Sequence, residues 1–565
     1  MTLDPATREA ARRWLAGEVD DRDRAELRAL LDRADNGEAA AVTELATRLA
    51  TPLRFGTAGL RGPVRAGPNG MNRAVVARAT SAVARWLTGQ GHGGGTVVVG
   101  GDARHRSAAL AAEAAAVLAG AGFAVRAFTE PVPTPLVAFA VRELDAVAGI
   151  QITASHNPAS DNGYKLYDAT GAQLAPPADT EIEAAMAAAP PATELPRSTS
   201  RHAVHSAPIG ERYLARVAQL PRGTTRSVRI AFTPLHGTGG KLALAALRRA
   251  GFTDVVVVDE QAEPDPDFPT VAFPNPEEPG VCDRLLELAS TTAADLAIAL
   301  DPDADRCAVG IPEPGTGFRM LSGDETGTLL GEYLLATLDR QRSPDPVVAS
   351  TVVSSSALAS IARAHGARYA ETLTGFKWLV RAAEQGAAGT LVYAYEEALG
   401  HCVDPATVRD KDGIATAVLA ADLAAARKAA GSSLRAMLDE LHVAHGVHVT
   451  EPLTLRLDAG EAASTIMTRL RQRPPSRLAE RSVTVTDLLP DADVLRYQGD
   501  GLRLAVRPSG TEPKLKAYLE AVEPVAGPGT AEALDQARTT AGHRLAALRQ
   551  DTRTLVTTAT TARTS

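Results

Sequence analysis

Short apolar segments and Ala-rich helical segments alternate along this chain in an order that restarts twice. The first series begins at Thr96–Gly100, continues through an Ala-rich stretch to Ala124–Phe128, and ends at Val147–Ile152. Apolar runs rich in Val and Ile predict strands, and strands that alternate with helices predict an α/β layer. The first part of the chain is therefore predicted to be an α/β domain.

The same order returns twice before the pattern changes. The second series contains strands predicted at 228–232, 255–258 and 296–300, and the third contains strands at 347–350 and 391–395. The last part has strands predicted at 453–457, 502–506 and 515–519, followed by one Ala/Leu helix at 531–548. We therefore predict three consecutive α/β domains followed by an α+β C-terminal domain.

A Pro-, Ser- and Thr-rich stretch at 190–208 marks one predicted boundary, and two others lie near 315–322 and 442–451. We predict an N-terminal helical extension, α/β domains I, II and III, an α+β domain IV and a flexible tail, at residues 1–50, 51–205, 206–320, 321–446, 447–550 and 551–565. The extension is predicted from leucines at helical spacing, and the tail from its Thr-rich sequence with few apolar residues. A chain of 565 residues is long enough for several separate cores.

The charge balance and the N-terminal sequence argue against several classes of partner. The formal net charge is -8 and no Lys/Arg-rich block occurs, so nucleic acid is not an expected partner. Residues Met1–Ala10 lack the apolar segment of a signal peptide, and the most apolar stretch, 108–125, suits a packed helix better than a membrane span. The 3 cysteines have no CxxC spacing. We expect a cytoplasmic protein.

A serine stands just beyond the predicted strand Ala148–Ile152. The segment Thr153–Pro158 is Thr-Ala-Ser-His-Asn-Pro, which places Ser155 at the carboxyl end of the strand, where α/β folds open their ligand sites. A simple turn is the alternative, because Ser, Asn and Pro all favour turns. The position predicts a nucleophile at Ser155.

Aspartates occupy alternate positions after the predicted strand at 296–300. They are Asp301, Asp303 and Asp305, and Arg306 follows them. Three carboxylates and a phosphate oxygen are ligands that suit Mg²⁺. An EF-hand calcium loop is rejected, because it needs Gly where Arg306 stands and Glu where Pro312 stands. An acidic surface loop is the other alternative, but Arg306 beside the aspartates favours a phosphoryl group in a cleft.

Two further loops offer groups that can bind a phosphate and a sugar. The segment Arg507–Lys514 joins two predicted strands and combines an arginine, two hydroxyls, a glycine and a lysine. Such a loop can surround a phosphate with donors, and a plain hairpin is the alternative. The segment Tyr395–His401 offers Glu396 and Glu397 as acceptors for sugar hydroxyls, and a charged surface loop is its alternative.

Taken together, these loops resemble the signatures of the α-D-phosphohexomutase family, which includes phosphoglucomutases and phosphomannomutases. The phosphoserine, metal, sugar and phosphate loops follow one another in the family order, and Phe55–Gly62 resembles the opening signature. Segments that resemble the phosphoglucomutase-2-like and phosphopentomutase branch are 233–239, 274–277, 375–378 and 410–413. The resemblance covers nearly the whole chain and implies three α/β phosphohexomutase domains and an α+β domain around a central cleft.

The resemblance also implies a magnesium-dependent phosphoryl transfer through a phosphoserine. The family's metal ligands match Ser155, through its phosphoryl group, and Asp301, Asp303 and Asp305. Arg61 and Arg306 are expected to neutralise charge on the transferring group, and Lys165 matches the candidate general base. His156 is expected to have only a supporting role, because adjacent side chains at an extended strand end point to opposite sides.

Binding of the sugar phosphate is expected from residues on several loops. They are Arg306, Gly375, Lys377, Glu396, Ala398, Arg507, Ser509, Gly510, Thr511 and Lys514. Ala398 stands where many hexose-specific members have serine, so the loop does not choose between glucose, mannose and a pentose. We expect reversible transfer between the 1- and 6-positions of an aldohexose phosphate, of glucose or of mannose, with glucose 1,6-bisphosphate as activator.

Other activities are compatible with the same serine. A phosphopentomutase and a glucose-1,6-bisphosphate synthase would use another acceptor or donor. A metal-dependent phosphatase would release phosphate to water, which the enclosed site and the phosphate loop argue against. A non-catalytic sugar-phosphate sensor is the alternative from a different class. The expected partners are small sugar phosphates, with a monomer or homodimer as the assembly.

Overall fold

The computed structural model of the chain describes residues 2–55, 59–200, 202–315, 317–384, 389–457, 462–509, 514–527 and 529–561. The chain groups into two compact units. Unit 1 comprises Met1–Leu321, Gly375–Arg381 and Ala398–Ala429, and unit 2 comprises Ser322–Thr374, Ala382–Glu397 and Ala430–Ser565. Within the described part of the chain, no helix has both the length and the apolar character needed to cross a membrane.

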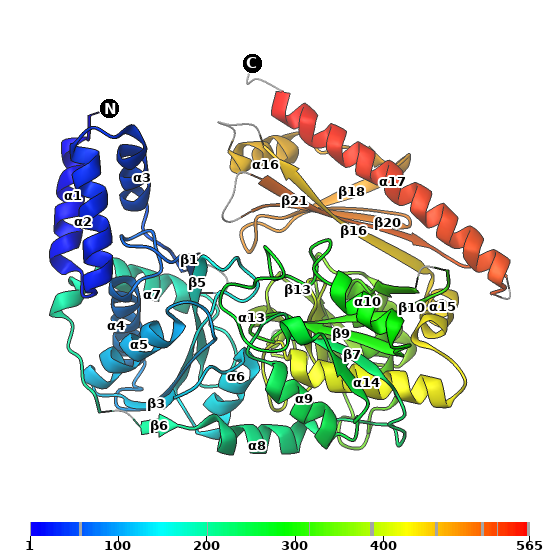
Figure 1. The fold of residues 1–565 in the computed structure, drawn as a ribbon. Helices are drawn as coiled ribbons and strands as arrows, with labels where there is room; N and C mark the ends of the chain where they lie inside the picture. The colour runs from blue at the N-terminus through cyan, green and yellow to red at the C-terminus, as the bar shows by residue number, and fades with distance from the viewer. Residues whose placement is uncertain are drawn as a thin grey trace. The chain divides into compact units, whose positions relative to one another are not determined.

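Unit 1 begins with three helices that pack against one another (Figure 1): α1 (Pro5–Gly17), α2 (Asp21–Asp35) and α3 (Ala39–Ala50). Asp4 caps the first helix by accepting a hydrogen bond from the Thr7 N–H at 2.9 Å, and Asp20 caps the second. Leucines at helical spacing, including Leu27 and Leu45, are fully buried between the helices. The helices therefore have a core of their own.

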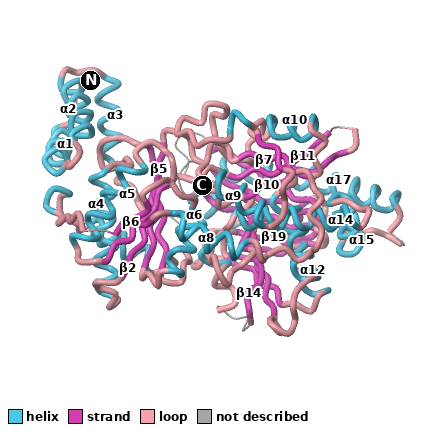
Figure 2. Tube along the Cα trace, turned by 60° about the horizontal axis from the view of Figure 1, so that its bottom comes forward, coloured by secondary structure: helices cyan, strands magenta, loops and turns pink. Residues whose placement is uncertain are grey.

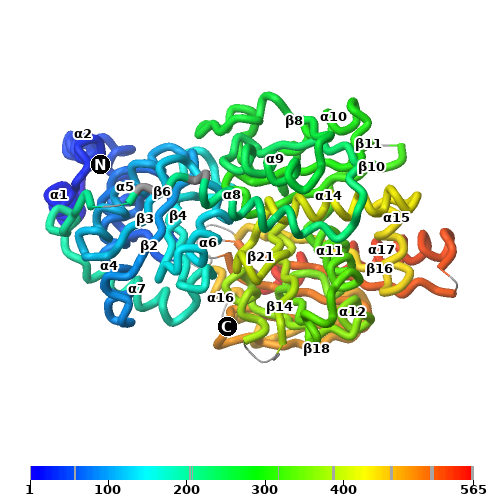
Figure 3. The backbone as a smooth tube through the Cα atoms, turned by 90° about the horizontal axis from the view of Figure 1, so that it is seen from below, coloured from blue at the N-terminus to red at the C-terminus, as the bar shows by residue number. Residues whose placement is uncertain are grey.

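The first sheet carries the serine loop. Its strands are β1 (Leu60–Pro63), β2 (Thr96–Gly101), β3 (Ala124–Phe128), β4 (Ala148–Ile152), β5 (Asp161–Asp168) and β6 (His202–Val204), in the spatial order β1-β5-β4-β2-β3-β6. Strand β2 runs parallel to β3 and β4, whereas β5 is antiparallel to β4. The helices are α4 (Arg73–Gly89), α5 (Ser107–Gly120), α6 (Thr134–Glu143), α7 (Ala178–Ala187) and α8 (Ser206–Val217). Figures 2 and 3 show α4 and α5 on one side of the sheet and α6 on the other.

The second sheet of unit 1 carries the metal loop. Its strands are β7 (Ile230–Thr233), β8 (Val255–Val257), β9 (Leu296–Leu300), β10 (Cys307–Glu313) and β11 (Gly317–Met320), in the order β11-β10-β9-β7-β8. Its helices are α9 (Gly240–Arg249), α10 (Asp283–Thr291) and, from later in the chain, α14 (Gly413–Ala429). Helix α10 packs on β7 and β9, and α14 packs on α9, β9 and β10. Strand β9 is buried at every position, which explains its uninterrupted apolar sequence.

Unit 2 contains a parallel sheet and a larger antiparallel one. In the first, β12 (Pro346–Thr351) pairs with β13 (Arg368–Thr372) and β14 (Thr390–Glu396), beside α11 (Gly323–Ala336), α12 (Ala357–Ala364) and α15 (Leu434–His445). The second has the order β16-β21-β20-β19-β18-β17. Its strands are β16 (Val447–Arg456), β17 (Arg477–Leu478), β18 (Arg481–Asp487), β19 (Leu495–Gly499), β20 (Leu502–Pro508) and β21 (Lys514–Glu523). Helix α16 (Ala463–Gln472) packs on β20.

The end of the chain differs from the expected flexible tail. Helix α17 runs from Ala531 to Thr561 and lies along the antiparallel sheet in Figure 1. Beyond Asp551 it still buries Val556 and Ala559 in the core formed with the sheet. The prediction of a loose segment from residue 551 is wrong up to Thr561, because these two apolar residues recur at helical spacing and continue the buried face.

Candidate functional site

Ser155 lies in a tight loop directly after β4. The Ser155 N–H donates to Thr153 Oγ1 at 2.9 Å, and the Asn157 N–H donates to the Ala154 carbonyl oxygen at 3.1 Å. The loop holds Ser155 in the left-handed region with φ 53°. The Ser155 side chain is buried, and its Oγ donates to Asp301 Oδ2 at 2.8 Å. The serine predicted from its place after a strand therefore contacts the first of the three aspartates.

The position of His156 corrects the sequence prediction. His156 Nδ1 lies 3.0 Å from Ser155 Oγ, so the two neighbouring side chains meet instead of pointing apart. The prediction was wrong because it assumed an extended backbone, whereas Ser155 has a positive φ that turns the chain. Burial, followed by the charges of Arg306 and Arg61, lowers the pKa of His156 well below its usual value. The ring is therefore neutral at physiological pH.

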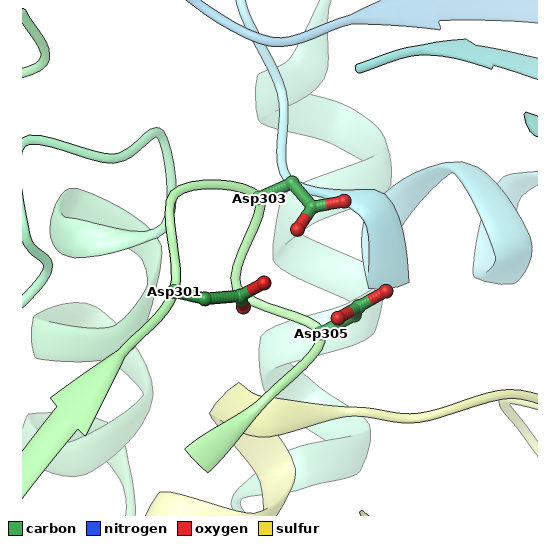
Figure 4. Close-up of side chains that lie close together, drawn as sticks. All are labelled: Asp301, Asp303 and Asp305. Atoms are coloured by element: carbon green, nitrogen blue, oxygen red, sulfur yellow. The ribbon is translucent and has the colours of Figure 1, made fainter. Parts of the chain in front are cut away.

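Strand β9 leads into the loop that carries Asp301, Asp303 and Asp305. One ligand atom from each aspartate lies within 4.8 Å of the others, and Figure 4 shows the three carboxyl groups turned toward a common space. All three side chains are buried. Ala304 at φ 57° gives the loop its tight turn, and the Ala304 N–H donates to the Asp301 carbonyl oxygen at 2.8 Å. The alternate spacing in the sequence thus becomes one cluster.

The cluster fits a divalent cation. Among the described residues, none makes a hydrogen bond to Asp303 Oδ1 or Asp305 Oδ1, although both oxygens are buried. Burial, and then the charges of Asp303 and Asp305, raise the pKa of Asp301 well above its usual value. Buried carboxylate oxygens without donors are typical of a site for a hard cation such as Mg²⁺.

Lys165 lies opposite the aspartates on β5, where it pairs in register with Gln151 of β4. Its Nζ lies 2.6 Å from Asp303 Oδ2 and 2.6 Å from Asp305 Oδ2. Burial alone would lower the pKa of Lys165, but the charges of these two carboxylates outweigh it, so the pKa is raised. Lys165 is therefore an ammonium ion here, and it can act as a base only when the two carboxylates are neutralised in another way.

Two residues of this site were missed from the sequence. Lys411 Nζ lies 3.4 Å from Asp305 Oδ2 and 5.1 Å from the centroid of the Phe376 ring. Thr134 Oγ1, at the start of α6, donates to Asp303 Oδ2 at 2.6 Å. The Asp-Lys-Asp-Gly segment at 410–413 resembles a family signature, but the resemblance assigns no role to its lysine. No local signal marks Thr134.

Gly413 explains how that segment approaches the metal loop. The Gly413 N–H donates to the Ala304 carbonyl oxygen at 3.1 Å. A Cβ at Gly413 would lie 2.4 Å from the carbonyl oxygen of Arg306, so a side chain there would push the two loops apart. The glycine therefore lets the segment that carries Lys411 pack directly on the metal loop.

Arg61 and Arg306, the two arginines expected to neutralise phosphoryl charge, adjoin the serine and metal loops. Arg61 on β1 donates through Nη1 to Asn157 Oδ1 at 3.4 Å, and its buried Nε has no hydrogen-bond partner in the described part of the chain. The Arg306 N–H donates to Asp301 Oδ1 at 3.0 Å, while its Nη1 donates to Glu277 Oε2 at 2.9 Å. Both arginines therefore place positive charge beside the acidic cluster.

Three of the predicted substrate-binding residues lie elsewhere in unit 1. Gly375 has φ 114° and precedes the short helix α13 (Phe376–Leu379). Lys377 is buried on this helix, and its Nζ pairs with Asp179 Oδ2 at 3.2 Å. Ala398 is half-buried just before the short strand β15 (Gly400–Cys402). The structure thus gives Lys377 an acidic partner of its own.

Unit 2 carries the glutamates and the phosphate loop. Glu396 ends β14, and Glu397 Oε2 accepts hydrogen bonds from Ser354 Oγ at 2.9 Å and Thr351 Oγ1 at 3.2 Å. Burial, and then Asp324, raise the pKa of Glu397. Burial would lower the pKa of Arg507, but Tyr518 and the two glutamates outweigh it and raise it. Arg507 is thus within electrostatic range of both glutamates.

Both ends of the phosphate loop are anchored on the antiparallel sheet. Arg507 Nη2 donates to Tyr518 Oη at 3.0 Å, and the Ser509 N–H donates to the carbonyl oxygen of Lys514 at 2.9 Å. Among the residues described, none accepts a hydrogen bond from the buried Arg507 Nε. Gly510 and Thr511, also predicted to bind phosphate, lie outside the described residues.

Family profiles match four successive segments of the chain. Profiles of the phosphoglucomutase/phosphomannomutase α/β/α domains I, II and III match residues 52–192, 211–315 and 322–442, and the profile of the C-terminal domain matches 477–537. The chain is 37% identical over 463 residues to a Haemophilus influenzae protein named "probable phosphomannomutase", with 80% of this chain and 93% of that protein covered. These matches confirm the predicted fold class of three α/β domains followed by a C-terminal domain.

Other relatives carry different substrate names. Human phosphopentomutase is 33% identical over 522 residues, covering 84% of this chain and 85% of that protein. A Staphylococcus aureus phosphoglucomutase is 31% identical over 495 residues, covering 83% and 89%. A phosphoglucomutase/phosphomannomutase family protein from Burkholderia thailandensis shares the fold, with a TM-score of 0.68, 20% identity, and 90% and 98% coverage.

Proposed function

Because the chain belongs to the α-D-phosphohexomutase (phosphoglucomutase/phosphomannomutase) family and is a phosphosugar mutase, we propose that it interconverts glucose 1-phosphate and glucose 6-phosphate, or the mannose equivalents. The observation that carries the proposal is the contact of Ser155 Oγ with Asp301 inside a buried cluster of three carboxylates. A serine in this place can carry a phosphoryl group, and glucose 1,6-bisphosphate would supply it as the activator.

Asp301, Asp303 and Asp305, with an oxygen of phosphorylated Ser155, would hold the Mg²⁺ ion. When bound, the ion would neutralise charge on the transferring phosphoryl group and engage the carboxylates with which Lys165 pairs. The donor set supports this role, because it consists of buried carboxylate oxygens, two of them without a hydrogen bond from any described residue.

Ser155 and Lys165 have different roles in the proposed transfer. In the first half-reaction the bond from phosphorus to Ser155 Oγ breaks as a bond forms to the free hydroxyl oxygen of the sugar phosphate. The proton of that hydroxyl passes to Lys165, which we propose as the base. The second half-reaction reverses these steps with the other phosphate of the bisphosphate, which returns a phosphoryl group to Ser155.

The remaining charged groups are proposed to bind and orient. Arg61 and Arg306 would stabilise the charge that spreads over the phosphoryl oxygens, and neutral His156 would hold the serine oxygen at 3.0 Å. The proposed substrate-binding residues are Arg306, Gly375, Lys377, Glu396, Ala398, Arg507, Ser509, Gly510, Thr511 and Lys514. Of these, Arg507 is supported most directly, since its buried Nε has no acceptor among the described residues.

Intact mass and coupled assays test the proposal together. The wild-type protein should carry a phosphate-sized mass increment that is lost in Ser155→Ala. It should also convert glucose 1-phosphate or mannose 1-phosphate in the presence of Mg²⁺ and the bisphosphate. A wild-type protein that gains no phosphate from the bisphosphate and converts none of the sugars would refute the proposal.

A phosphopentomutase is the second candidate, and a specific observation favours it. The human phosphopentomutase matches 84% of this chain, and Ala398 removes a hydroxyl from the sugar loop. Without that hydroxyl the loop discriminates less between hexose and pentose configurations. A kcat/KM for ribose 1-phosphate at least about tenfold above that for glucose 1-phosphate would establish this candidate in place of the first.

A further inference from the structure

Arg104 lies in the loop between β2 and α5, and its guanidinium group binds the main chain of the serine loop. Its Nη2 donates to the carbonyl oxygens of Ser155 and Asn157, each at 2.6 Å. Its Nη1 donates to the carbonyl oxygens of Pro158 at 2.7 Å and Asp161 at 3.2 Å. One side chain therefore holds both ends of the segment 155–161.

Arg104 is itself fixed from several sides. Its Nε lies 3.4 Å from Asp102 Oδ2, and its N–H donates to Asp102 Oδ1 at 3.0 Å. The Ser107 hydroxyl donates to the same Asp102 Oδ1 at 2.6 Å. The ring of Phe268 covers the guanidinium group at 4.8 Å from its centroid, and the side chain is 1% exposed. These contacts hold the guanidinium group in a single orientation toward the loop carbonyl groups.

The serine loop needs such a restraint. Ser155 has a left-handed backbone, which a residue with a side chain adopts only where the surroundings impose it. Its carbonyl oxygen bonds to Arg104 while its Oγ bonds to Asp301, so the residue is held at its main chain and at its reacting atom. Loss of the main-chain restraint would let the backbone relax and move Oγ away from the carboxylates.

We propose that Arg104 is a positioning residue for phosphoryl transfer, which keeps Ser155 Oγ in place through the four loop carbonyls. The inference rests on the proposed function, because position matters only if Ser155 carries the phosphoryl group. Phosphoryl transfer depends mainly on placement and charge, so a small shift of the serine oxygen lowers the rate of the chemical step.

The variant Arg104→Lys separates the geometry from the charge. Lysine keeps the positive charge but has three donors at one point, and it cannot span carbonyls that need a planar fork. We expect kcat to fall about 10²-fold while KM stays within about threefold, because the loop is misplaced while substrate binding groups are unchanged. Amide hydrogen exchange in the peptide covering 153–163 should become faster, since the Asn157 and Asp161 N–H groups bond within this loop.

Arg226 provides a matched control in the same unit. It donates to the carbonyl oxygens of Ala250 at 2.7 Å, Gly223 at 2.9 Å and Thr225 at 2.7 Å, and it pairs with Asp422 at 3.1 Å. The Phe252 ring lies 5.1 Å from its guanidinium group, much as Phe268 covers Arg104. Arg226 lies before the amino end of β7, whereas the metal loop follows the carboxyl end of the parallel strand β9. Arg226→Lys should leave kcat and exchange in 153–163 unchanged.

A second variant tests the same role in case Arg104→Lys does not fold. Asp102→Asn keeps the size and hydrogen-bond acceptor at that position but removes the charge beside Arg104 Nε, and we expect kcat to fall about tenfold. Unchanged kcat in both variants, or an equal loss in Arg226→Lys, would overturn the positioning role. Faster exchange without any loss of kcat would overturn it too. A wild-type protein without mutase activity would contradict the proposed function alone, and exchange would then decide whether Arg104 holds the loop.

Discussion

Asp301 differs from Asp303 and Asp305 in the direction of its pKa shift. Its pKa is raised by burial and by the charges of Asp303 and Asp305, whereas Asp305 has a lowered pKa because Lys165, Lys411 and Arg306 outweigh burial. A raised pKa means that Asp301 keeps its proton to a higher pH than usual. A metal ligand must be ionised, so cation binding has to displace this proton.

Because the pKa of Asp301 is raised, we expect Mn²⁺ binding, used as a probe of the Mg²⁺ site, to release protons and to strengthen as the pH rises. Calorimetric titrations in two buffers with different ionisation heats count the protons. Asp301→Asn should abolish the release. Lys165→Gln is the control, because a release that persists in it cannot come from the lysine. Binding that is independent of pH and releases no proton would contradict the assignment to Asp301.

At the scale of elements, the N-terminal helices are joined to the first sheet through Arg106. This residue precedes α5 with φ 67°, and its Nη2 lies 2.8 Å from Asp23 Oδ2 and 3.0 Å from Asp20 Oδ2. Asp23 is fully buried at the start of α2. Removing a buried partner leaves the guanidinium group only partly compensated.

Asp23→Ala should lower the unfolding free energy by about 2–3 kcal/mol, as measured by the shift in the urea midpoint. Glu38→Gln is the control, since it removes an exposed pair with Arg33. Exposed ion pairs are screened by solvent and contribute little to stability, so the urea midpoint of this variant should hardly move. Equal shifts of the urea midpoint in the two variants would show that the buried Asp23 contact stabilises the fold no more than an exposed pair does.

Glu520 on β21 joins the two sheets of unit 2. Its Oε1 accepts hydrogen bonds from Ser355 Oγ and the Ser356 N–H, both at 2.8 Å, and its Oε2 lies 3.1 Å from Arg503 Nε. Burial would raise the pKa of Glu520, but Arg503 and His448 outweigh it and lower the pKa to about 2. A carboxyl group whose pKa is lower in the folded state stabilises the protein at pH values above its pKa in the unfolded state. This stabilisation is lost as the pH falls toward the pKa of the folded state.

Glu520→Gln should therefore cost about 3 kcal/mol at pH 7, and the difference from wild type should narrow as the pH falls from about 4.5 toward about 2. Urea midpoints over this range provide the measurement. Glu451→Gln, on the neighbouring strand β16, is the matched control, because its pair with Arg549 at 3.4 Å is partly exposed. A difference that stays constant with pH would refute the electrostatic origin.

At the scale of the whole molecule, each compact unit has hydrophobic cores of its own. One core of unit 1 includes Val97 and Ile150, and one core of unit 2 includes Leu504 and Leu519. Separate cores predict more than one cooperative transition. We expect calorimetry to resolve at least two, with Asp23→Ala shifting one and Glu520→Gln the other. A single transition that both variants lower equally would contradict this expectation.

The sequence by itself determined the features that depend on local pattern. Strand β9 matched its predicted range of 296–300, because five consecutive apolar residues leave little choice for a short buried strand. Ser155 and the three aspartates could be predicted as site residues because each loop follows directly after such a strand, and a loop at the end of a strand is a local property. The same reasoning predicted the α/β layers, since alternation of strands and helices is visible in the sequence.

Only the tertiary structure decided which distant residues meet. Lys165, on the first sheet, pairs with Asp303 and Asp305, which follow a strand of the second sheet. Lys411, from the segment before α14, contacts Asp305. Arg104 donates hydrogen bonds to the loop of Ser155. The contact of His156 with Ser155 accompanies a single positive φ, at Ser155. These contacts join residues far apart in the chain, and their geometry is set by packing, which has no periodic signature in the sequence.

The compact units likewise do not follow the order of the chain. Residues Ala398–Ala429 belong to unit 1, although the segments before and after them belong to unit 2. Helix α14 shows the reason, because it packs on α9, β9 and β10 of the second sheet. Its Ala-rich sequence favours a helix, and every residue from Gly413 to Ala425 is buried, but the sequence cannot specify which of several apolar surfaces the helix will cover. That choice depends on the shapes that the other elements present once folded.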